Sequence, residues 1–185
     1  MRAIFVTSNE NKRREAEGVL GVKLDAASPE LPEIQSLDFA EVVRHKALAA
    51  YDALALDLPP TPILVEDSGI VFGAWNGMPG ALTKWFLESS GNEGLLKMLA
   101  SFEDRSARAV CCVAVVDGAG EVEVFTGEVG GTISEEPRGE GGFGWDSIFV
   151  PEGSSRTYAE MGEEKNSDSH RARAFRSAGK WLAKQ

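Results

Sequence analysis

Apolar positions in the first third of the chain change from a continuous run to a helical stripe. Residues 2–6 are nearly all apolar and predict a buried first strand, and helical composition follows over residues 12–20. A longer helix is predicted from about residue 39, because apolar side chains recur there on one face. That stripe consists of Phe39, Val43, Ala47, Ala50 and Leu54. Prolines at positions 59, 60 and 62 end the pattern.

The middle of the chain has shorter apolar runs. Residues 63–65 and 69–72 predict two strands separated by the polar triplet at positions 66–68, and residues 79–87 and 94–99 predict two helices. Apolar strands over residues 107–116 and 122–129 flank a glycine-rich turn and predict a hairpin. A strand over residues 147–150 and a helix over residues 169–184 complete the chain.

This order of elements predicts an α/β fold. Helices and strands are interspersed and a long hairpin is included, so we expect a mixed β-sheet with flanking helices. With 185 residues, we expect one domain spanning residues 1–185. Gly139, Gly141 and Gly144 match the dinucleotide-binding fingerprint. That motif needs a strand before it and a helix after it, whereas here a strand follows, so a Rossmann site is rejected.

The net charge limits the classes of ligand that we expect, and the cysteines bear on the cellular compartment. The net charge is −10, which disfavours a long nucleic acid, since such binding draws on Lys and Arg contacts to phosphates. A small anion bound through a divalent metal fits the acidity. Cys111 and Cys112 are adjacent on a predicted strand and would point to opposite faces, so a mutual disulfide is not expected. We expect a reduced, intracellular protein with no membrane span.

Two stretches follow predicted strands and carry polar side chains. The first, Thr7-Ser8-Asn9-Glu10-Asn11-Lys12, opens a helix, whose free N–H groups suit a phosphate. The alternative is that Asn9 or Asn11 only caps that helix. In the second, Glu66 and Asp67 should point oppositely, so that one holds Mg²⁺ and the other supports it. The alternative there is a simple turn.

Glu33 and Glu41 lie outside these two stretches and give weaker evidence of function. Glu33 stands between apolar residues, and alone it indicates little. Asp38 and Glu41 resemble a helix capping box, so Glu41 is predicted to be structural.

Phe143 and Trp145 flank Gly144 in a glycine-rich loop and precede Asp146. Aromatic rings beside glycines make a slot that could hold a nucleobase, with the glycines letting the backbone approach it. The alternative is a hydrophobic plug over the sheet. Lys165, His170 and Arg171 crowd the start of the last helix, which Ser167 or Asp168 is predicted to cap. Their alternative roles are a structural histidine and solvated basic side chains.

Taken in order, these stretches resemble the inosine triphosphate pyrophosphatase (Ham1-like) family. The resemblance rests on TSNENK, LPEIQ, VEDSG, GMPGALTKWF, FGWDSIFVPEG, TYAEM and EKNSDSHRARA, and it covers almost the whole chain. It implies an elongated mixed sheet with two lobes around a central nucleotide cleft. It also implies a cytoplasmic homodimer that uses Mg²⁺ to hydrolyse ITP, dITP and XTP to the monophosphate and pyrophosphate.

The resemblance also assigns roles to residues. Residues 7–12, Ser68 and Lys84 would contact the nucleotide, with Lys12 also catalytic. Glu33 and Asp67 would hold the metal, and Asp67 would activate water. The base and sugar would be held by Phe143, Gly144, Trp145, Asp146, Lys165, His170 and Arg171. Family members usually have Gly where Ser8 stands, and many have Tyr where Trp145 stands. Two alternatives remain at this level: a nucleotidase for modified pyrimidine or methylated nucleotides, and a non-catalytic nucleotide-binding module.

Overall fold

The computed structural model describes residues 3–54 and 61–184. It contains a six-stranded sheet in the order β2-β1-β3-β4-β5-β6. The strands are β1 (Ile4–Val6), β2 (Asp25–Ala27), β3 (Ile63–Phe72), β4 (Ser106–Val116), β5 (Val122–Ile133) and β6 (Phe149–Pro151). β1 is parallel to β2 and β3, and the other neighbours are antiparallel. The expected mixed α/β sheet is therefore confirmed.

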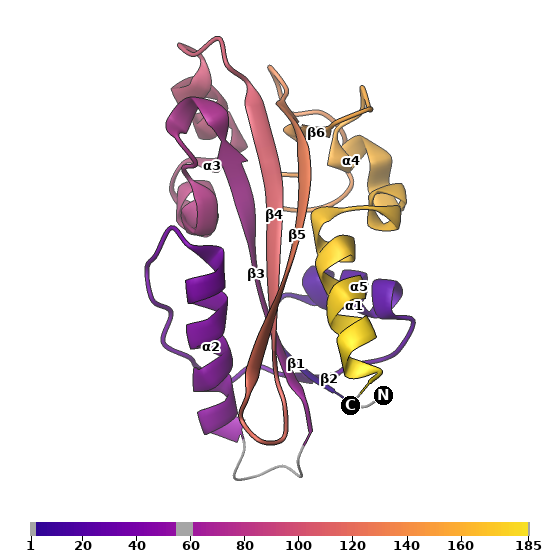
Figure 1. Ribbon diagram of the computed structural model, residues 1–185. Helices are drawn as coiled ribbons and strands as arrows, with labels where there is room; N and C mark the ends of the chain where they lie inside the picture. The colour runs from indigo at the N-terminus through magenta and orange to yellow at the C-terminus, as the bar shows by residue number, and fades with distance from the viewer. Residues whose placement is uncertain (1–2, 55–60, 185) are drawn as a thin grey trace.

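Helices cover both faces of this sheet. They are α1 (Glu10–Leu20), α2 (Phe39–Leu54), α3 (Thr83–Leu99), α4 (Tyr158–Met161) and α5 (His170–Leu182). Figure 1 shows α2 and α3 on one side of the sheet and α1, α4 and α5 on the other. Three short 3-10 helices, Gly73–Trp75, Gly80–Leu82 and Gly162–Ser167, join them. Within the described ranges, no helix is both long and apolar enough to cross a membrane.

The apolar core is divided by the sheet and along its length. Side chains of α2 pack on one face with Cys112, and side chains of α1 and α5 pack on the other with Cys111. The two cysteines thus lie on opposite faces, as the strand alternation predicts. A third cluster occupies the far end of β3, β4 and β5 and includes Phe72, Leu95, Trp145 and Phe149. Figure 1 shows these three long strands running the length of an elongated molecule.

Strands β1 and β3 differ greatly in length. β3 has ten residues, but β1 has three and pairs only with Ile63 and Leu64. Farther along, Thr83 borders the same edge of β3, where its Oγ1 accepts a hydrogen bond of 2.9 Å from the Ile70 N–H. Between these two contacts, no described strand pairs with β3 on that side. The polar triplet of β3 lies in this interval.

Several boundaries differ from the sequence predictions. The two strands predicted over residues 63–72 are one strand, because residues 66–68 continue the ladder with β4, and the turn interpretation is wrong. The two helices predicted over residues 79–87 and 94–99 correspond to the two segments of α3, which are separated by a break at Gly91 (φ 63°, ψ −177°), and a 3-10 turn precedes the first of them. β2 was not predicted, since three largely exposed residues carry no clear pattern.

Helix starts also needed correction. Ser169 caps α5, accepting from the Ala172 N–H at 3.1 Å, rather than Ser167 or Asp168. Asp38 accepts from the Ala40 N–H at 2.8 Å at the start of α2, but the Asp38 N–H donates to Ser36 and the Glu41 carboxylate accepts from the Ser36 hydroxyl, so the predicted capping box with Glu41 does not form. Residue 2 and the prolines at positions 59 and 60 lie outside the described residues.

Candidate functional site

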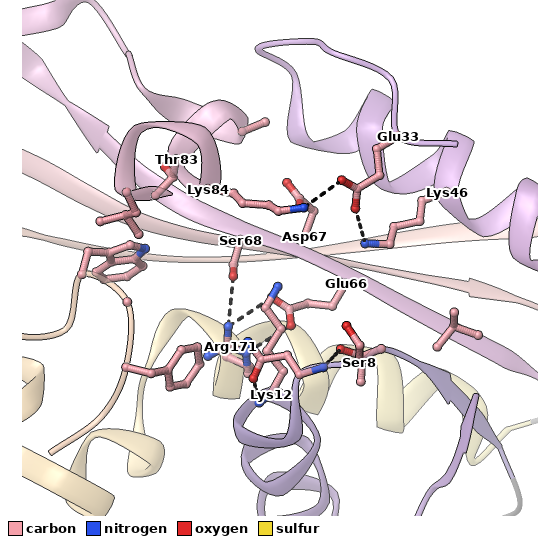
Figure 2. A pocket seen from close by; sticks show the side chains of 18 of the residues that line it. Ser8, Lys12, Glu33, Lys46, Glu66, Asp67, Ser68, Thr83, Lys84 and Arg171 are labelled. Carbon is pink, nitrogen blue, oxygen red and sulfur yellow. Dashed lines mark hydrogen bonds and ion pairs between the residues drawn. The ribbon is translucent and has the colours of Figure 1, made fainter. Parts of the chain in front are cut away.

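A cavity of about 480 Å³ opens where β1 ends and β3 continues. Residues from β1, α1, α2, β3, α3, the 143–146 loop and α5 line it. Those already singled out from the sequence are Thr7, Ser8, Asn9, Lys12, Glu33, Asp67, Ser68, Lys84, Phe143, Gly144, Trp145, Asp146, His170 and Arg171. Glu10, Asn11 and Lys165 are not among the lining residues. Because the cavity straddles the edge of β3, side chains from both faces of that strand reach it (Figure 2).

The start of α1 forms one wall. The Asn9 side chain caps the helix, accepting from the N–H groups of Asn11 (3.0 Å) and Lys12 (3.2 Å), which confirms the capping role of Asn9. Thr7 Oγ1 accepts from the Asn9 N–H at 3.1 Å. Ser8 is exposed and also lines the cavity. Glu10 instead points to Arg13 on the surface, at 2.6 Å.

On the α2 side of β3, Asp67 lies near an exposed cluster of charges. Glu33 accepts from Lys46 and Lys84, each at 3.3 Å. Although its partial burial opposes the change, the charges of Lys46 and Lys84 lower the pKa of Glu33. Asp67 has a buried Oδ2 with no hydrogen-bond partner among the described residues. Burial, with a contribution from Glu66 and Glu33, raises the pKa of Asp67 to about 6 against the opposing charges of Lys12 and Lys46.

These two acids suit a magnesium ion. Figure 2 shows Glu33 and Asp67 on the same side of β3, and both line the cavity. In the described residues, no group of three or more His, Cys, Asp and Glu side chains could form a complete metal cage. Mg²⁺ is commonly held by one or two carboxylates, with water and substrate phosphates filling the other positions. The unpartnered Asp67 oxygen, together with Glu33, fits that pattern.

On the opposite side of β3, Glu66 is buried and fully paired. Its carboxylate lies 3.1 Å from Arg171 Nη2 and 3.4 Å from Lys12 Nζ. Burial alone would raise the pKa of Glu66, but Arg171 and Lys12 hold it well below its usual value. Glu66 and Asp67 therefore face different environments, as their alternation on the strand predicts.

The ion pairs continue as a buried chain, which we define as Lys12, Glu66, Arg171, Glu15, Lys165 and Asp146. It connects the start of α1 to the 143–146 loop. Arg171 donates to Glu66 from Nε and Nη2, to Glu15 from Nη1 at 2.6 Å, and to Ser68 from Nη2 at 3.0 Å. Among the described residues, these contacts engage four of its five N–H groups and leave one, on Nη1, for a ligand. Lys165 and Arg171 are each 3% exposed, so the solvated-helix alternative is wrong.

Phe143 and Trp145, the two aromatic residues of the 143–146 loop, differ in burial and in contacts. Trp145 is 7% exposed and packs edge-on against Phe149, at 5.6 Å between ring centres. The plug alternative therefore describes Trp145 well, although part of the ring reaches the cavity. Phe143 is only half-buried and covers the cations of Lys165 (5.0 Å) and Arg171 (5.3 Å).

The glycines of this loop serve packing more than ligand access. A Cβ on Gly139 or Gly141 would collide with the backbone at residues 159–160, and one on Gly142 would meet the Asp146 carboxylate. Only Gly144 lines the cavity. His170 lies nearby and is buried; burial and the charge of Arg171 keep its pKa well below the usual value, so the ring is neutral at pH 7. Neither ring nitrogen has a partner in the described structure.

Sequence reasoning missed three polar contributors to the site. Lys46 lies off the apolar stripe of α2, and this position is the one signal in the sequence that could have indicated it. Glu15 is 4% exposed, yet nothing local distinguishes it from the surface acids of α1. Asn92 follows the break in α3 and reaches the 143–146 loop, donating to the Gly144 carbonyl at 2.8 Å.

The chain is similar to known proteins over almost its whole length. The model of the Ham1 family matches residues 3–181. The chain is 46% identical to inosine triphosphate pyrophosphatase 2 of Trypanosoma cruzi, over 94% of this chain and 88% of the relative. It is 39% identical to the dITP/XTP pyrophosphatase of Methanopyrus kandleri, over 98% and 96%.

The same family appears among solved structures. A HAM1 protein from Coxiella burnetii superposes with a TM-score of 0.83 at 27% identity, covering all of both chains. The Ham1 protein of Staphylococcus aureus also gives 0.83, at 26% identity over 99% of this chain and 98% of that one. The protein described here is a member of the Ham1 family.

Proposed function

We propose that this protein hydrolyses deaminated purine nucleoside triphosphates, ITP, dITP and XTP, to the monophosphate and pyrophosphate. The observation that carries the proposal is the unpartnered, buried carboxylate oxygen of Asp67 in a cavity whose two ends suit phosphate and a purine. Relatives at 39–46% identity named as ITP or dITP/XTP pyrophosphatases support the substrate class.

The charges around the cavity explain why a divalent cation is part of the proposal. The described lining has four cations, Lys12, Lys46, Lys84 and Arg171, and five acids, Glu33, Glu66, Asp67, Glu88 and Asp146. The formal sum is 4 − 5 = −1, so the protein alone does not neutralise a triphosphate. Mg²⁺, held by Glu33 and Asp67, would supply the missing positive charge and stabilise charge that develops on the phosphate.

The side chains then have distinct tasks. At the N-terminus of α1, Ser8 and Lys12 bind phosphate oxygens through the Ser8 hydroxyl and the Lys12 charge, because the N–H groups of Asn9, Asn11 and Lys12 already donate to side chains of the turn. Lys46 and Lys84 approach from the other side of β3 and orient the leaving pyrophosphate. A water oxygen attacks the α-phosphorus, the α–β anhydride bond breaks, and Asp67 takes the proton of the water. A carboxyl group whose pKa lies near 6 suits a general base at neutral pH.

The direct test is product analysis with ITP in ¹⁸O-labelled water, with Mg²⁺ and after its removal with EDTA. We expect turnover only with the metal, pyrophosphate as the released product, and label in the monophosphate. Label in free orthophosphate, with no other pyrophosphatase present, would contradict cleavage at the α-phosphorus. Absence of Mg²⁺-dependent turnover would favour a binding module instead.

We also propose, from the family resemblance, that the protein acts as a homodimer. Sedimentation equilibrium tests this directly. A mass of one chain over the working concentration range would refute it.

A further inference from the structure

The 143–146 loop has a peptide group whose direction is set from outside the loop. Within the loop, Phe143 and Asp146 close a turn, since the Asp146 N–H donates to the Phe143 carbonyl at 3.2 Å. The Asp146 carboxylate in turn accepts from the Phe143 N–H at 2.9 Å. Gly144 stands between them with φ 62°, a conformation that glycine adopts without strain. These contacts leave the Gly144 carbonyl to a partner elsewhere.

That partner is Asn92 of α3. Its Nδ2 donates to the Gly144 carbonyl at 2.8 Å and to Ser147 Oγ at 3.0 Å, although more than fifty positions separate it from both. Asn92 follows directly after Gly91, where the helical path is broken. The following turns of α3 are fixed in the core by Leu95, Leu96 and Leu99. Asn92 therefore holds the loop from a rigid support.

Holding this carbonyl also directs the next N–H group. Among the described residues, the only cis peptide bond is Met78–Pro79, so the bond between Gly144 and Trp145 is trans. In a trans peptide the C=O and N–H point in opposite directions. With the carbonyl directed to α3, the Trp145 N–H points away from α3. No acceptor in the described structure takes this N–H, while Gly144 and Trp145 both line the cavity.

We propose that Asn92 is a positioning residue for base recognition: its amide holds the Gly144–Trp145 peptide so that the Trp145 N–H is presented to the 6-keto oxygen of the substrate purine. This inference rests on the proposed function and deepens it. The Trp145 N–H serves as the donor to this oxygen in place of Arg171, because most N–H groups of Arg171 already donate to Glu66, Glu15 and Ser68.

The direction of the Gly144–Trp145 peptide determines which purines bind, because it decides whether a donor or an acceptor faces position 6 of the base. Hypoxanthine and xanthine carry a keto acceptor at position 6, whereas adenine carries an amino donor there. If the peptide turns over, a carbonyl replaces the N–H in the cavity and the preference for a keto group is lost. Because Gly144 has no Cβ, this rotation meets little steric resistance in the absence of Asn92. Asn92 thus opposes a local change that would admit adenine nucleotides.

The test compares Asn92→Asp with the wild type. Aspartate has nearly the same shape but, at neutral pH, donates no hydrogen bond to the Gly144 carbonyl. We expect IMP affinity, measured by calorimetry, to fall about tenfold, which is the usual order for a lost hydrogen bond. Pyrophosphate affinity should stay within about twofold, and kcat/KM for ITP relative to ATP should fall by about tenfold, mainly through KM. Asn92→Ala should do the same.

The control is Glu93→Gln on the same helix, an exposed neighbour that should leave all these values unchanged. Thermal unfolding of each variant separates misfolding from lost recognition. An Asn92→Asp variant that keeps wild-type IMP affinity would overturn the proposal, and so would one that loses IMP and pyrophosphate affinity equally. If instead the wild type fails to hydrolyse ITP at all, the proposed function itself is wrong.

Discussion

Asp67 and Glu66 are neighbours on one strand, yet the protein treats their charges in opposite ways. Glu66 is buried among Arg171 and Lys12 and stays ionised far below its usual range, with its pKa lowered by those cations against the effect of burial. Asp67 has burial without a hydrogen-bond partner for Oδ2, and its pKa rises to about 6. The first carboxylate is committed to the structure, while the second is left available for chemistry.

Asp67→Asn tests the chemical role of Asp67 directly and should have the largest effect of the substitutions considered. We expect kcat for ITP to fall by about 10² to 10⁴, because a general base and a metal ligand are lost together. Nucleotide binding should persist in part, since Lys12, Lys84 and the loop are untouched. The measurement is steady-state pyrophosphate release under saturating Mg²⁺. A variant that keeps more than roughly a tenth of the wild-type kcat would show that Asp67 has neither role.

The opposite side of β3 is tested by Arg171→Leu. This change leaves Glu66 and Glu15 buried with fewer partners, so unfolding free energy should fall by about 3–5 kcal/mol. Urea denaturation at pH 7 measures it. The matched control is Lys84→Ala, which removes an exposed ion pair with Glu33 and should cost about 1 kcal/mol or less. Equal losses in the two variants would mean that the buried chain is no more important than a surface pair.

A comparison within the 143–146 loop separates a plug from a binding surface. Trp145→Ala removes a core ring and should destabilise the fold by about 3–5 kcal/mol. Phe143→Ala should change stability much less but weaken IMP binding by about 1–3 kcal/mol, the usual contribution of a stacked aromatic ring. Chemical denaturation and calorimetry on both variants decide the matter. The division of roles fails if Phe143→Ala is the more destabilising change.

The smallest expected effect concerns pH. An acid whose pKa is higher in the folded state stabilises the fold below its unfolded pKa, and this contribution disappears as pH rises through about 6. Asp67→Asn removes that titration. The variant should therefore gain stability relative to the wild type between pH 4 and pH 7, by about 1–2 kcal/mol for a partly accessible side chain. A difference in Tm that stays constant over this range would show that Asp67 does not titrate in it.

Much of this architecture could be read from local patterns. The period-two alternation of residues 111–112 and 66–67 placed each neighbour on the correct face, and the Asn9 cap followed from ordinary helix chemistry. The continuous strand β3 could not be foreseen, because its polar triplet resembles a turn and only pairing with β4 makes it extended. Local propensity carries no information about such a distant partner.

The unpredicted part of the site has the same origin. Glu15, Lys46 and Asn92 lie on helices that look ordinary in sequence. Lys46 lines the cavity, whereas Glu15 and Asn92 contact two residues of its lining, Arg171 and Gly144, and the fold alone brings these partners together. Conversely, the glycines at positions 139–142 suggested access for a ligand. A Cβ at these glycines would collide with the backbone of residues 159–160 or with the Asp146 side chain, so their role is in packing. A glycine-rich composition indicates that another group lies close to the backbone, but it does not show whether that group belongs to a ligand or to the protein itself.

The short length of β1 has a consequence for how this family of sites can change. The cavity lies where β3 continues beyond β1 with no described strand on that side, so the proposed substrate would occupy the place of a sheet neighbour. The number of β1 residues that pair with β3 therefore sets how far the cavity extends along β3. Adding residues to the carboxyl end of β1 would close it, and none of the side chains that bind or react would have been altered.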